Sequence, residues 1–507
     1  MPISLAPADY MAILPAAILF ATGLVVLIAD LLVKQDGYDD PSSQKSHLVF
    51  LGLCGSALAF ASLFAPQGLL AGAWGQDAVA AGSQTVFMGA LRVDAFGGFI
   101  AAVIIVAIAL TTLASGGYLA SQDQNRGEFY GLVFLGGGAM LLLAQASNLI
   151  SIFVAIETLS LSVYVLAGFF RKWKSGSEGA LKYFILGAFS SGFLLMGMML
   201  IYGATGEVTL EALGKSTSDP YLLNIGLLLL LVGFGFKVGA VPFHSWVPDA
   251  YQGAPTTAAG WMAVAVKVCS FGALLRVVIA SSQGGLADAS TGKMLAALAV
   301  VTMVLGNLAA LNQTNIKRML AYSGIAHTGY LLIPVVLAFQ GTDPKVGAGA
   351  LFYLAAYLLM TIGAFTAIAM VSTGDTDREE LEDFNGLAKR QPFVAFALTV
   401  SLLSMAGMPG TAGFLGKLTI FRDAVESGPY FYLALIGILA SLVSVYYYLR
   451  PIVAMYFREE GTTIDVVENT WGVRLTLFIT SFGTLILFFW GRSVHELSIR
   501  SIESITG

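Results

Sequence analysis

The sequence predicts an all-α protein that crosses a membrane about fourteen times. Three observations support this fold class. Hydrophobic residues make up 57% of the 507 residues and charged residues only 11%, and the mean hydropathy is +0.80, which excludes a water-soluble globule. Apolar runs of about 20 residues, each long enough to span a bilayer, follow one another along the chain. Two long runs contain a proline, at Pro242 and at Met408-Pro409-Gly410, and predict broken helices because proline removes a backbone donor.

The predicted spans can be taken in chain order. The first apolar run follows Asp9 with no basic segment before it, so we expect a retained span and not a cleaved signal peptide. The connection over 65–91 is rich in Gly and Ala, and the one over 373–390 is charged and suited to water. The expected spans lie at about 10–33, 46–64, 92–114, 128–146, 148–170, 179–205, 219–250 (broken), 255–280, 291–311, 315–339, 346–372, 391–424 (broken), 429–457 and 470–490.

Loop charge predicts the orientation of these spans. With strict alternation, one side of the membrane collects most of the basic loop residues, and the positive-inside rule makes that side cytoplasmic. Both termini then lie on the outer side, as expected for a multi-pass protein of a bacterial inner membrane. The basic residues of the cytoplasmic side are Lys34, Lys45, Arg126, Arg171, Lys172, Lys174, Lys317, Arg318, Arg378, Lys389, Arg390 and Arg458.

The two broken spans recur at an interval of about five helices, which predicts an internal repeat. A duplicated unit with an odd number of spans inserts its copies in opposite orientations, and paired broken helices indicate such an inverted repeat with an ion site in each half. The expected units are an N-terminal three-helix segment (1–127), two half-repeats (128–281 and 282–457), and a C-terminal transmembrane helix with its tail (458–507).

Sequence signatures of bound cofactors are missing. Cys54 and Cys269 lie in apolar stretches without a Cys or His neighbour at metal spacing, so we expect no iron–sulfur cluster, zinc site or disulfide. No GxGxxG follows a strand and no GxxxxGK occurs, so we expect neither NAD nor ATP to bind this chain. With a formal net charge of -5, the sequence shows no basic patch of the kind that binds nucleic acid.

Glu157 is the only charged residue of the apolar segment NLISIFVAIETLSLSVYVLAGFF. A lone carboxylate at membrane depth is neutralised by desolvation unless a cation lies within reach. Glu157 therefore predicts either a structural ion pair with a lysine of a neighbouring helix or a functional pair whose proton affinity shifts.

Three lysines also fall inside apolar runs: Lys237 before Pro242, Lys267 in the next run, and Lys417 just past the second break. A lysine at the centre of a spanning helix is disfavoured by about 2.5 to 3.5 kcal/mol, so it requires a partner, water or a function. Pro242 is expected to leave unpaired carbonyls beside Lys237. Because the proton affinity of a buried amine depends on a nearby carboxylate, moving Glu157 would switch Lys237. The alternative for each lysine is snorkelling toward the interface.

Two histidines extend the predicted site. His244 follows Pro242, and His327 lies in the apolar run AYSGIAHTGYLLIPVV. Either could link lysines through water, since the ordinary pKa of histidine lies near physiological pH. The alternative is a core histidine hydrogen-bonded to a backbone carbonyl.

Four segments of the sequence resemble one known family. They are ETLSLSVYVLAGF, KVGAVPFHSWVPDAYQGAPTT, NIKRMLAYSGIAHTGYLLI and MPGTAGFLGKLTIF, and they look like the antiporter-like membrane subunit N of respiratory complex I, NADH-quinone oxidoreductase. Similar subunits occur in multisubunit sodium/proton antiporters. The resemblance covers about 128–457, and its one departure is SMAGMPGTAGF, where similar proteins more often carry a Gly-Ile-Pro-Pro break.

The resemblance implies a proton-translocating subunit of fourteen helices with inverted five-helix repeats. Its proton relay would fall on Glu157, Lys237, Lys267 and Lys417. In the family, NADH, FMN, iron–sulfur clusters and quinone belong to partner subunits, and this subunit carries no cofactor. Its partners would be the other membrane subunits of the complex, including antiporter-like paralogues.

Two functions therefore remain open from the sequence, with a third in reserve. The first is a proton-translocating subunit of a redox-driven complex, and the second is a subunit of a multisubunit sodium/proton antiporter. The reserve is a scaffold whose buried charges only fix helix packing; against it, a lysine lies beside a helix break in each half, and buried ion pairs contribute little stability.

Overall fold

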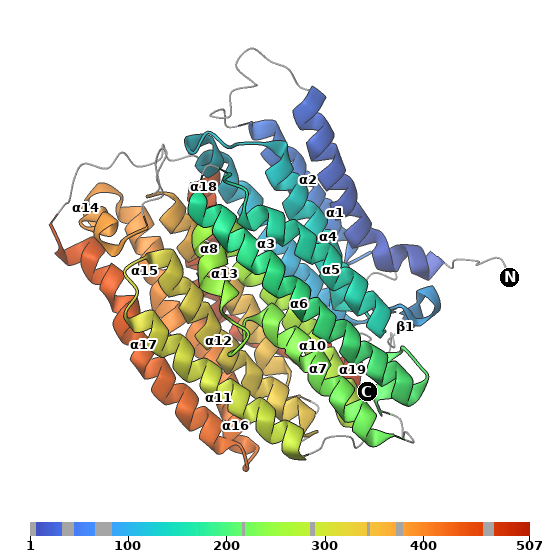
Figure 1. Cartoon of the computed structure of the whole chain (residues 1–507). Coiled ribbons are helices and arrows are strands. Elements are labelled where there is room, and N and C mark those ends of the chain that lie inside the picture. Colours follow the sequence, from blue (N-terminus) through green and yellow to red (C-terminus); the bar gives the residue numbers. More distant parts are fainter. Residues whose placement is uncertain are drawn as a thin grey trace.

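The computed structural model of the protein describes residues 7–32, 45–65, 84–171, 173–214, 219–283, 289–341, 345–371, 379–459 and 471–506. Most of these residues are helical, and the long helices run side by side in one bundle (Figure 1). Three of the basic residues that predicted the orientation, Lys34, Lys172 and Arg378, lie outside the described residues.

In the described chain, twelve helical spans are long and apolar enough to cross a membrane. Two further apolar helices, α2 (Ser46–Ser62) and α15 (Pro392–Ala406), are shorter. Together they confirm the prediction of an all-α membrane protein with about fourteen spans. The long helices are α1 (Pro7–Leu32), α3 (Ala95–Ser121), α4 (Gly127–Gln145), α5 (Leu149–Ala167), α6 (Lys174–Thr205), α7 (Pro220–Val238), α11 (Ala289–Leu311), α12 (Ile316–Phe339), α13 (Ala348–Ala369), α17 (Phe431–Phe457) and α18 (Trp471–Phe489). The remaining long span, Thr256–Ser282, consists of α9 (Thr256–Trp261), a π-helical turn (Met262–Val266) and the start of α10 (Lys267–Gln283).

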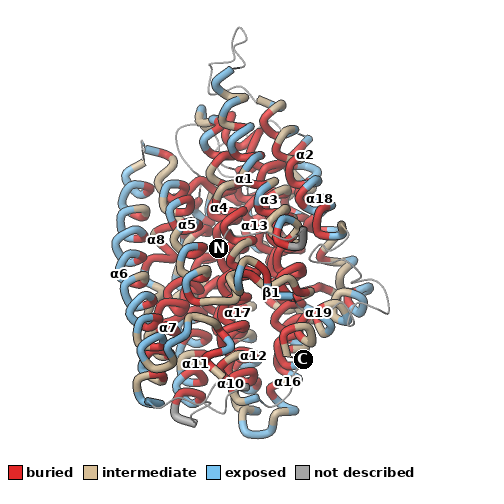
Figure 2. Tube along the Cα trace, turned by 90° about the vertical axis from the view of Figure 1, so that its right-hand side faces the viewer, coloured by how far each residue is buried: buried red, intermediate tan, exposed pale blue. Residues whose placement is uncertain are grey.

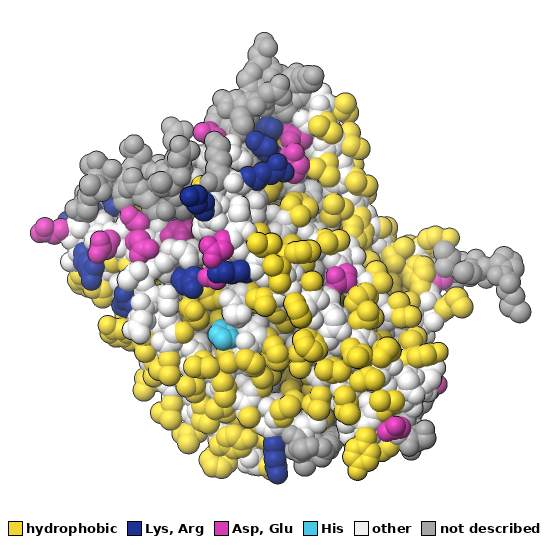
Figure 3. Space-filling view, viewed as in Figure 1, with side chains coloured by type: hydrophobic (Ala, Val, Ile, Leu, Met, Phe, Trp, Pro, Cys, Tyr) yellow, Lys and Arg dark blue, Asp and Glu magenta, His cyan; other side chains and the backbone are white. Residues whose placement is uncertain are grey.

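Burial separates central helices from outer ones. All of the most apolar window of Thr256–Ser282 is buried, and 94% of that of α12, against 33% for α6. The outer helices carry most of the exposed residues (Figure 2), many of them large and apolar. Apolar side chains cover the middle of the face in Figure 3, while most charged side chains lie toward its upper edge. Lipid suits such an outer surface better than water does. The central helices carry Lys267 and His327, away from this surface.

Two elements of the fold were not predicted. A short antiparallel hairpin of β1 (Gln84–Val86) and β2 (Leu91–Val93) lies at the end of the connection 65–91 and takes up the first residues of the predicted span 92–114. The tail after α18 is a helix, α19 (Gly491–Thr506), which packs against α3 and α13. The tail was missed because its sequence has few apolar residues.

Candidate functional site

The first broken span divides into two helices, and Gly239 caps the C-terminal end of the first of them, α7. Its φ of 73° lies in the left-handed region that glycine adopts without strain. The N–H of Ala240 donates to Gly235 O at 2.8 Å, which completes a Schellman motif. Thus α7 stops at Val238, before Pro242 is reached, and the expectation that Pro242 sets the break is wrong. The chain resumes as α8 (Trp246–Gly253).

The second broken span has the same cap. Gly407 has a φ of 85°, and the N–H of Met408 donates to Leu403 O at 3.0 Å. After this Schellman motif, the chain resumes as α16 (Ala412–Glu426). The two predicted broken helices are therefore present, whereas their relation by an inverted repeat stays a prediction.

The carbonyls freed at the first break have partners inside the protein. Phe236 O accepts a hydrogen bond from Trp246 Nε1 at 3.1 Å, and Val238 O accepts one from Thr328 Oγ1 at 2.7 Å. The expectation of unpaired carbonyls beside Lys237 is therefore corrected. Irregular backbone at membrane depth is tolerated in this way when neighbouring helices supply donors.

Lys237 lies in the last turn of α7, and only 3% of its surface is exposed. Its amine donates to Ser160 Oγ at 2.7 Å and lies 3.4 Å from the hydroxyl of Tyr164. Both partners are on α5. The amine therefore points into the bundle, which excludes snorkelling.

Glu157 lies on the same face of α5 as these hydroxyls, because Ser160 and Tyr164 follow it at helical spacing. Its carboxylate is half-buried and accepts a hydrogen bond from Ser191 Oγ of α6. In the described structure no ion pair within 4.0 Å joins Glu157 to Lys237. The structural ion pair between Glu157 and a neighbouring lysine, the alternative stated above, is therefore not formed with Lys237. The Lys237 amine instead bonds the hydroxyl of Ser160, one helical turn after Glu157.

Lys267 is the first residue after the π-helical turn, and its side chain is buried. Its amine donates to Gly324 O of α12 and lies 5.0 Å from the centre of the Tyr357 ring. A cavity of about 10 Å³ is lined by both Lys237 and Lys267, with Gly324 at its wall. That volume is close to the least that a water molecule needs.

His327 is buried in α12, and hydroxyl groups contact both of its ring nitrogens. Tyr353 OH contacts Nδ1, and Tyr448 OH lies 3.0 Å from Nε2. Tyr448 also contacts the hydroxyl of Ser323. This arrangement differs from the core histidine bonded to a backbone carbonyl, because every partner can both donate and accept a proton.

The amine of Lys417 binds backbone carbonyls at the C-terminal end of α15, the helix before the second break. This buried amine donates to Met405 O at 2.8 Å, to Ala406 O at 3.2 Å and to Ser441 Oγ at 2.7 Å. The ring centre of Tyr330 lies 5.0 Å away. A cation at a helix C-terminus offsets the partial negative charge there, so this lysine stabilises the break as well as occupying the core.

Polar side chains fill the space between His327 and Lys417. Tyr447 OH donates to Asn307 Oδ1 at 2.9 Å, and Asn307 Nδ2 lies 3.1 Å from Tyr330 OH. The Tyr330 ring contacts both ends of this group, with its centre 5.7 Å from that of the His327 ring and 5.0 Å from the Lys417 amine.

His244 lies apart from this group. It is half-buried in the turn between α7 and α8, and its Nδ1 is buried without a hydrogen-bond partner. Within the described residues, no hydrogen bond connects it to Lys237 or His327.

Sequence reasoning missed the hydroxyl and amide groups of the core. They lie in apolar runs, where Ser and Tyr are common and carry no charge to attract notice. The spacing of Glu157, Ser160 and Tyr164 was the one available signal, since it puts them on one helix face. The missed residues are Ser160, Tyr164, Ser191, Asn307, Tyr330, Tyr353, Ser441, Tyr447 and Tyr448.

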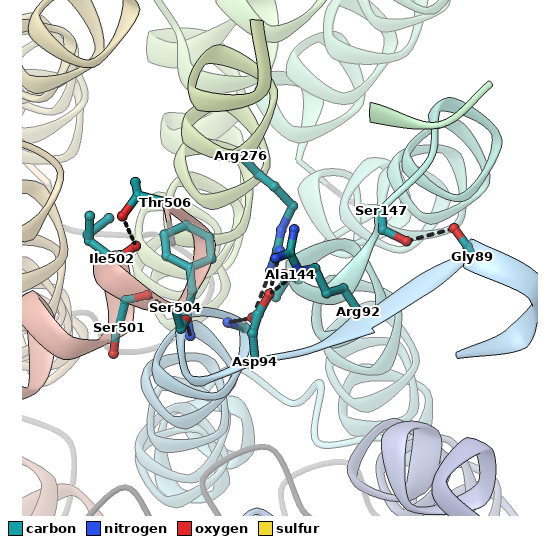
Figure 4. A network of polar contacts seen from close by, with 12 residues as sticks. Gly89, Arg92, Asp94, Ala144, Ser147, Arg276, Ser501, Ile502, Ser504 and Thr506 are labelled. Carbon is teal, nitrogen blue, oxygen red and sulfur yellow. Dashed lines mark hydrogen bonds and ion pairs between the residues drawn. The ribbon is translucent and has the colours of Figure 1, made fainter. Parts of the chain in front are cut away.

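The helix that carries Lys267 is anchored by a buried ion pair at its other end. Figure 4 shows Arg276 of α10 pointing toward Asp94, with Nη1 at 2.6 Å from Oδ2 and Nη2 at 3.0 Å from Oδ1. Arg276 also donates to Ala144 O of α4 at 2.9 Å. Phe96 N donates to Ser504 Oγ of α19 at 3.2 Å. One network therefore joins α10 to α3, α4, the hairpin and the C-terminal helix.

A bundle of membrane-spanning helices with a buried amine beside each of two breaks defines an antiporter-like membrane protein. A sequence model of the NADH:quinone oxidoreductase/Mrp antiporter transmembrane family matches residues 146–444. The chain is 40% identical over 479 residues to NADH-quinone oxidoreductase subunit N of Trichlorobacter lovleyi, covering 94% of this chain and 93% of that protein. It therefore belongs to the NADH-quinone oxidoreductase subunit N family.

Solved structures agree with this assignment. A chain of respiratory complex I from Thermus thermophilus is 33% identical, with a TM-score of 0.77, and the match covers 95% of this chain and 98% of that one. A chain of the Mrp complex from Dietzia sp. shares the fold at 20% identity, with a TM-score of 0.81 and 99% of each chain covered. Within the described ranges, no group of three or more His, Cys, Asp or Glu side chains could hold a metal ion.

Proposed function

We propose that this chain is a proton-translocating membrane subunit of an NADH:quinone oxidoreductase, in which it carries no redox chemistry of its own. NADH, FMN, iron–sulfur clusters and quinone would be bound by partner subunits, and antiporter-like paralogues would be among its membrane neighbours. The observation that supports the proposal is the core itself: three buried lysine amines lie in one bundle, and hydroxyl groups and a histidine lie in the same core.

Protons would pass between Lys237, Lys267, His327 and Lys417. The cavity of about 10 Å³ between the first two lysines is close to the size of one water molecule. From Lys267, the Tyr357 ring and the hydroxyls around His327 lead toward the Asn307 amide and Lys417. Hydroxyl groups and water both donate and accept, so each hydroxyl or water contact can carry a proton in either direction; past the face of the Tyr357 ring, water would have to carry it. His244, outside this hydrogen-bonded group, would contribute only through water.

Glu157 would act as the switch. Its carboxylate accepts a hydrogen bond from Ser191 in the structure, and a second arrangement would bring it closer to Lys237, whose amine bonds Ser160 on the same face of α5. Opposite charge nearby favours the ammonium form of a lysine, so the arrangement near Lys237 would load this amine and the other would release its proton. A neighbouring subunit drives the step only if it binds the two arrangements with different free energy.

Replacing Lys237 with Met tests the relay. Membrane vesicles that contain the assembled complex would be supplied with NADH and quinone, and proton uptake would be measured per NADH oxidised. We expect a reduced proton yield with intact assembly, because Met is unbranched and only one heavy atom shorter than Lys but carries no charge. Lys293→Met, at an exposed position of α11, is the matched control. An unchanged proton yield in a well-assembled Lys237→Met complex would reject the relay.

The alternative of a sodium/proton antiporter subunit is not favoured. The curated relatives reported at 35% identity or more are subunit N proteins, whereas the Mrp complex is similar in fold at 20% identity. Replacing sodium by potassium in the vesicle assay separates the two functions, since an antiporter would lose its proton flux.

We also propose that the membrane is the bacterial inner membrane and that both termini lie on its outer side. Phe87 N donates to Asp9 Oδ1 at 2.8 Å, so the hairpin lies at the N-terminal end of α1. Met88, 91% exposed in that hairpin, is a marker for this side. Cysteine at Met88 should react in intact cells stripped of their outer membrane with a thiol reagent that does not cross the inner one; protection would reverse the orientation.

A further inference from the structure

A pocket of about 560 Å³ opens between α1, α4 and α5, at the end of the bundle where α4 begins and α5 ends. These three helices lie side by side in Figures 1 and 2. The inner wall of the pocket is apolar, with side chains from all three helices: Leu27, Leu132, Leu135 and Val165. None of the proposed proton-carrying residues lines it. This wall faces the outer, apolar surface of the bundle, where acyl chains would lie.

The rim of the pocket is basic. Arg126 and Arg171 both line it and both are exposed. Within the described structure, neither guanidinium forms a hydrogen bond or an ion pair. Among the described residues of the lining, Glu128 is the one acidic side chain, so the described rim has an excess of positive charge. The N-terminus of α4 adds little to this charge, because Gly127 N already donates to Asp30 Oδ2 at 2.7 Å.

A second pocket at the same end of the bundle provides a contrast. It has a volume of about 660 Å³, and its lining includes Arg450 and Arg458 but also Glu380 and Glu382. Arg450 already donates to two backbone carbonyls, those of Leu311 and Gln313. The positive and negative side chains therefore balance in the pocket of about 660 Å³, whereas positive charge is in excess in the pocket of about 560 Å³. The two pockets are similar in size and differ in their charge and in the apolar wall of the pocket between α1, α4 and α5.

We infer that the pocket between α1, α4 and α5 binds one anionic phospholipid, with its phosphate between Arg126 and Arg171 and its acyl chains along the apolar wall. Arginine binds phosphate through two parallel hydrogen bonds, and basic pockets between membrane helices suit anionic headgroups. The basic loops predict that this end is cytoplasmic, the leaflet whose anionic lipids attract such residues. The bound lipid would cover the C-terminal end of α5, the helix that carries Glu157 and Ser160.

Lipid counting on the intact membrane assembly tests this inference. The wild-type assembly and an Arg126→Ala/Arg171→Ala variant would be purified in mild detergent, stripped of loose lipid and incubated with phosphatidylglycerol or phosphatidylcholine. Bound lipids would be counted by native mass spectrometry. We expect the variant to hold one phosphatidylglycerol fewer, with no change for phosphatidylcholine. Arg458→Ala, in the charge-balanced pocket, is the matched control and should keep the wild-type count.

A second measurement is independent of lipid counts and of the assembly of the double variant. Phosphatidylglycerol with a photoreactive group near its headgroup would be added to wild-type membranes, and cross-linked peptides would be mapped. Cross-links on residues 122–135 or 165–173 support the site. An equal lipid count in wild type and double variant would overturn it, as would cross-links of this pocket to another protein subunit in place of lipid.

Discussion

Removing the hydroxyl of Ser191 should shift Glu157 toward Lys237. Ser191 Oγ donates to the carboxylate of Glu157, and a hydrogen bond to a charged group contributes about 1.5 to 3 kcal/mol. Since each 1.4 kcal/mol is a factor of about ten in an equilibrium, Ser191→Ala should change the ratio of the two arrangements by about ten- to a hundredfold. The carboxylate would then stay near the amine, which would hold its proton.

The assay is NADH-driven proton uptake by vesicles, read together with NADH oxidation. We expect Ser191→Ala to slow proton uptake by about tenfold or more, in line with the shifted ratio, while the complex assembles normally. Ser190→Ala is the control, because the Ser190 hydroxyl bonds Gly233 O of α7 and does not touch Glu157. Wild-type proton uptake by Ser191→Ala, or an equal loss in Ser190→Ala, would refute the two-position switch.

Three further predictions concern the framework around the amines. Arg276→Met should destabilise the subunit by about 3 kcal/mol, measured as a lower melting temperature of the assembly, because it removes the bidentate partner of the buried Asp94 carboxylate and leaves only Arg92, whose Nε lies 3.7 Å from Oδ2. Gly407→Ala should cost about 1 to 2 kcal/mol, since its φ is 85° and a Cβ would lie 3.1 Å from Lys417 Cδ; Gly192→Ala, within α6 with open space around it, should melt at or above the wild-type temperature. Tyr448→Phe removes the hydroxyl at 3.0 Å from His327 Nε2 and should slow proton uptake, whereas Tyr446→Phe, 63% exposed on the same helix, should not. A wild-type rate for Tyr448→Phe would remove this tyrosine from the route.

Charge made the main residues of the site predictable. Glu157, Lys237, Lys267 and Lys417 stand out in apolar runs because the membrane makes isolated charge costly, and the structure places all three amines inside the bundle. What the amines bind could not be predicted. Hydroxyl partners such as Ser160 come from helices distant in sequence, and single serines are common in membrane helices.

The helix breaks, the C-terminal helix and the hairpin were predicted only in part or not at all. The approximate position of each break followed from proline, but the residue that ends each helix is a glycine whose left-handed conformation was not considered. The tail that forms α19 escaped notice because a search for long apolar runs does not detect an amphipathic helix. The hairpin strands are three residues each, too short for an alternating pattern to be visible.

The hydrogen bond from Thr328 to Val238 O has a mechanical consequence. Thr328 follows His327 on α12, in the second half of the chain, while Val238 follows Lys237 at the break in the first half. Each partner is thus the immediate neighbour of a residue of the proposed relay. A displacement of the backbone at the first break would therefore move the turn of α12 that carries His327. A structural change in one half of the molecule would in this way reach the other half without any proton transfer.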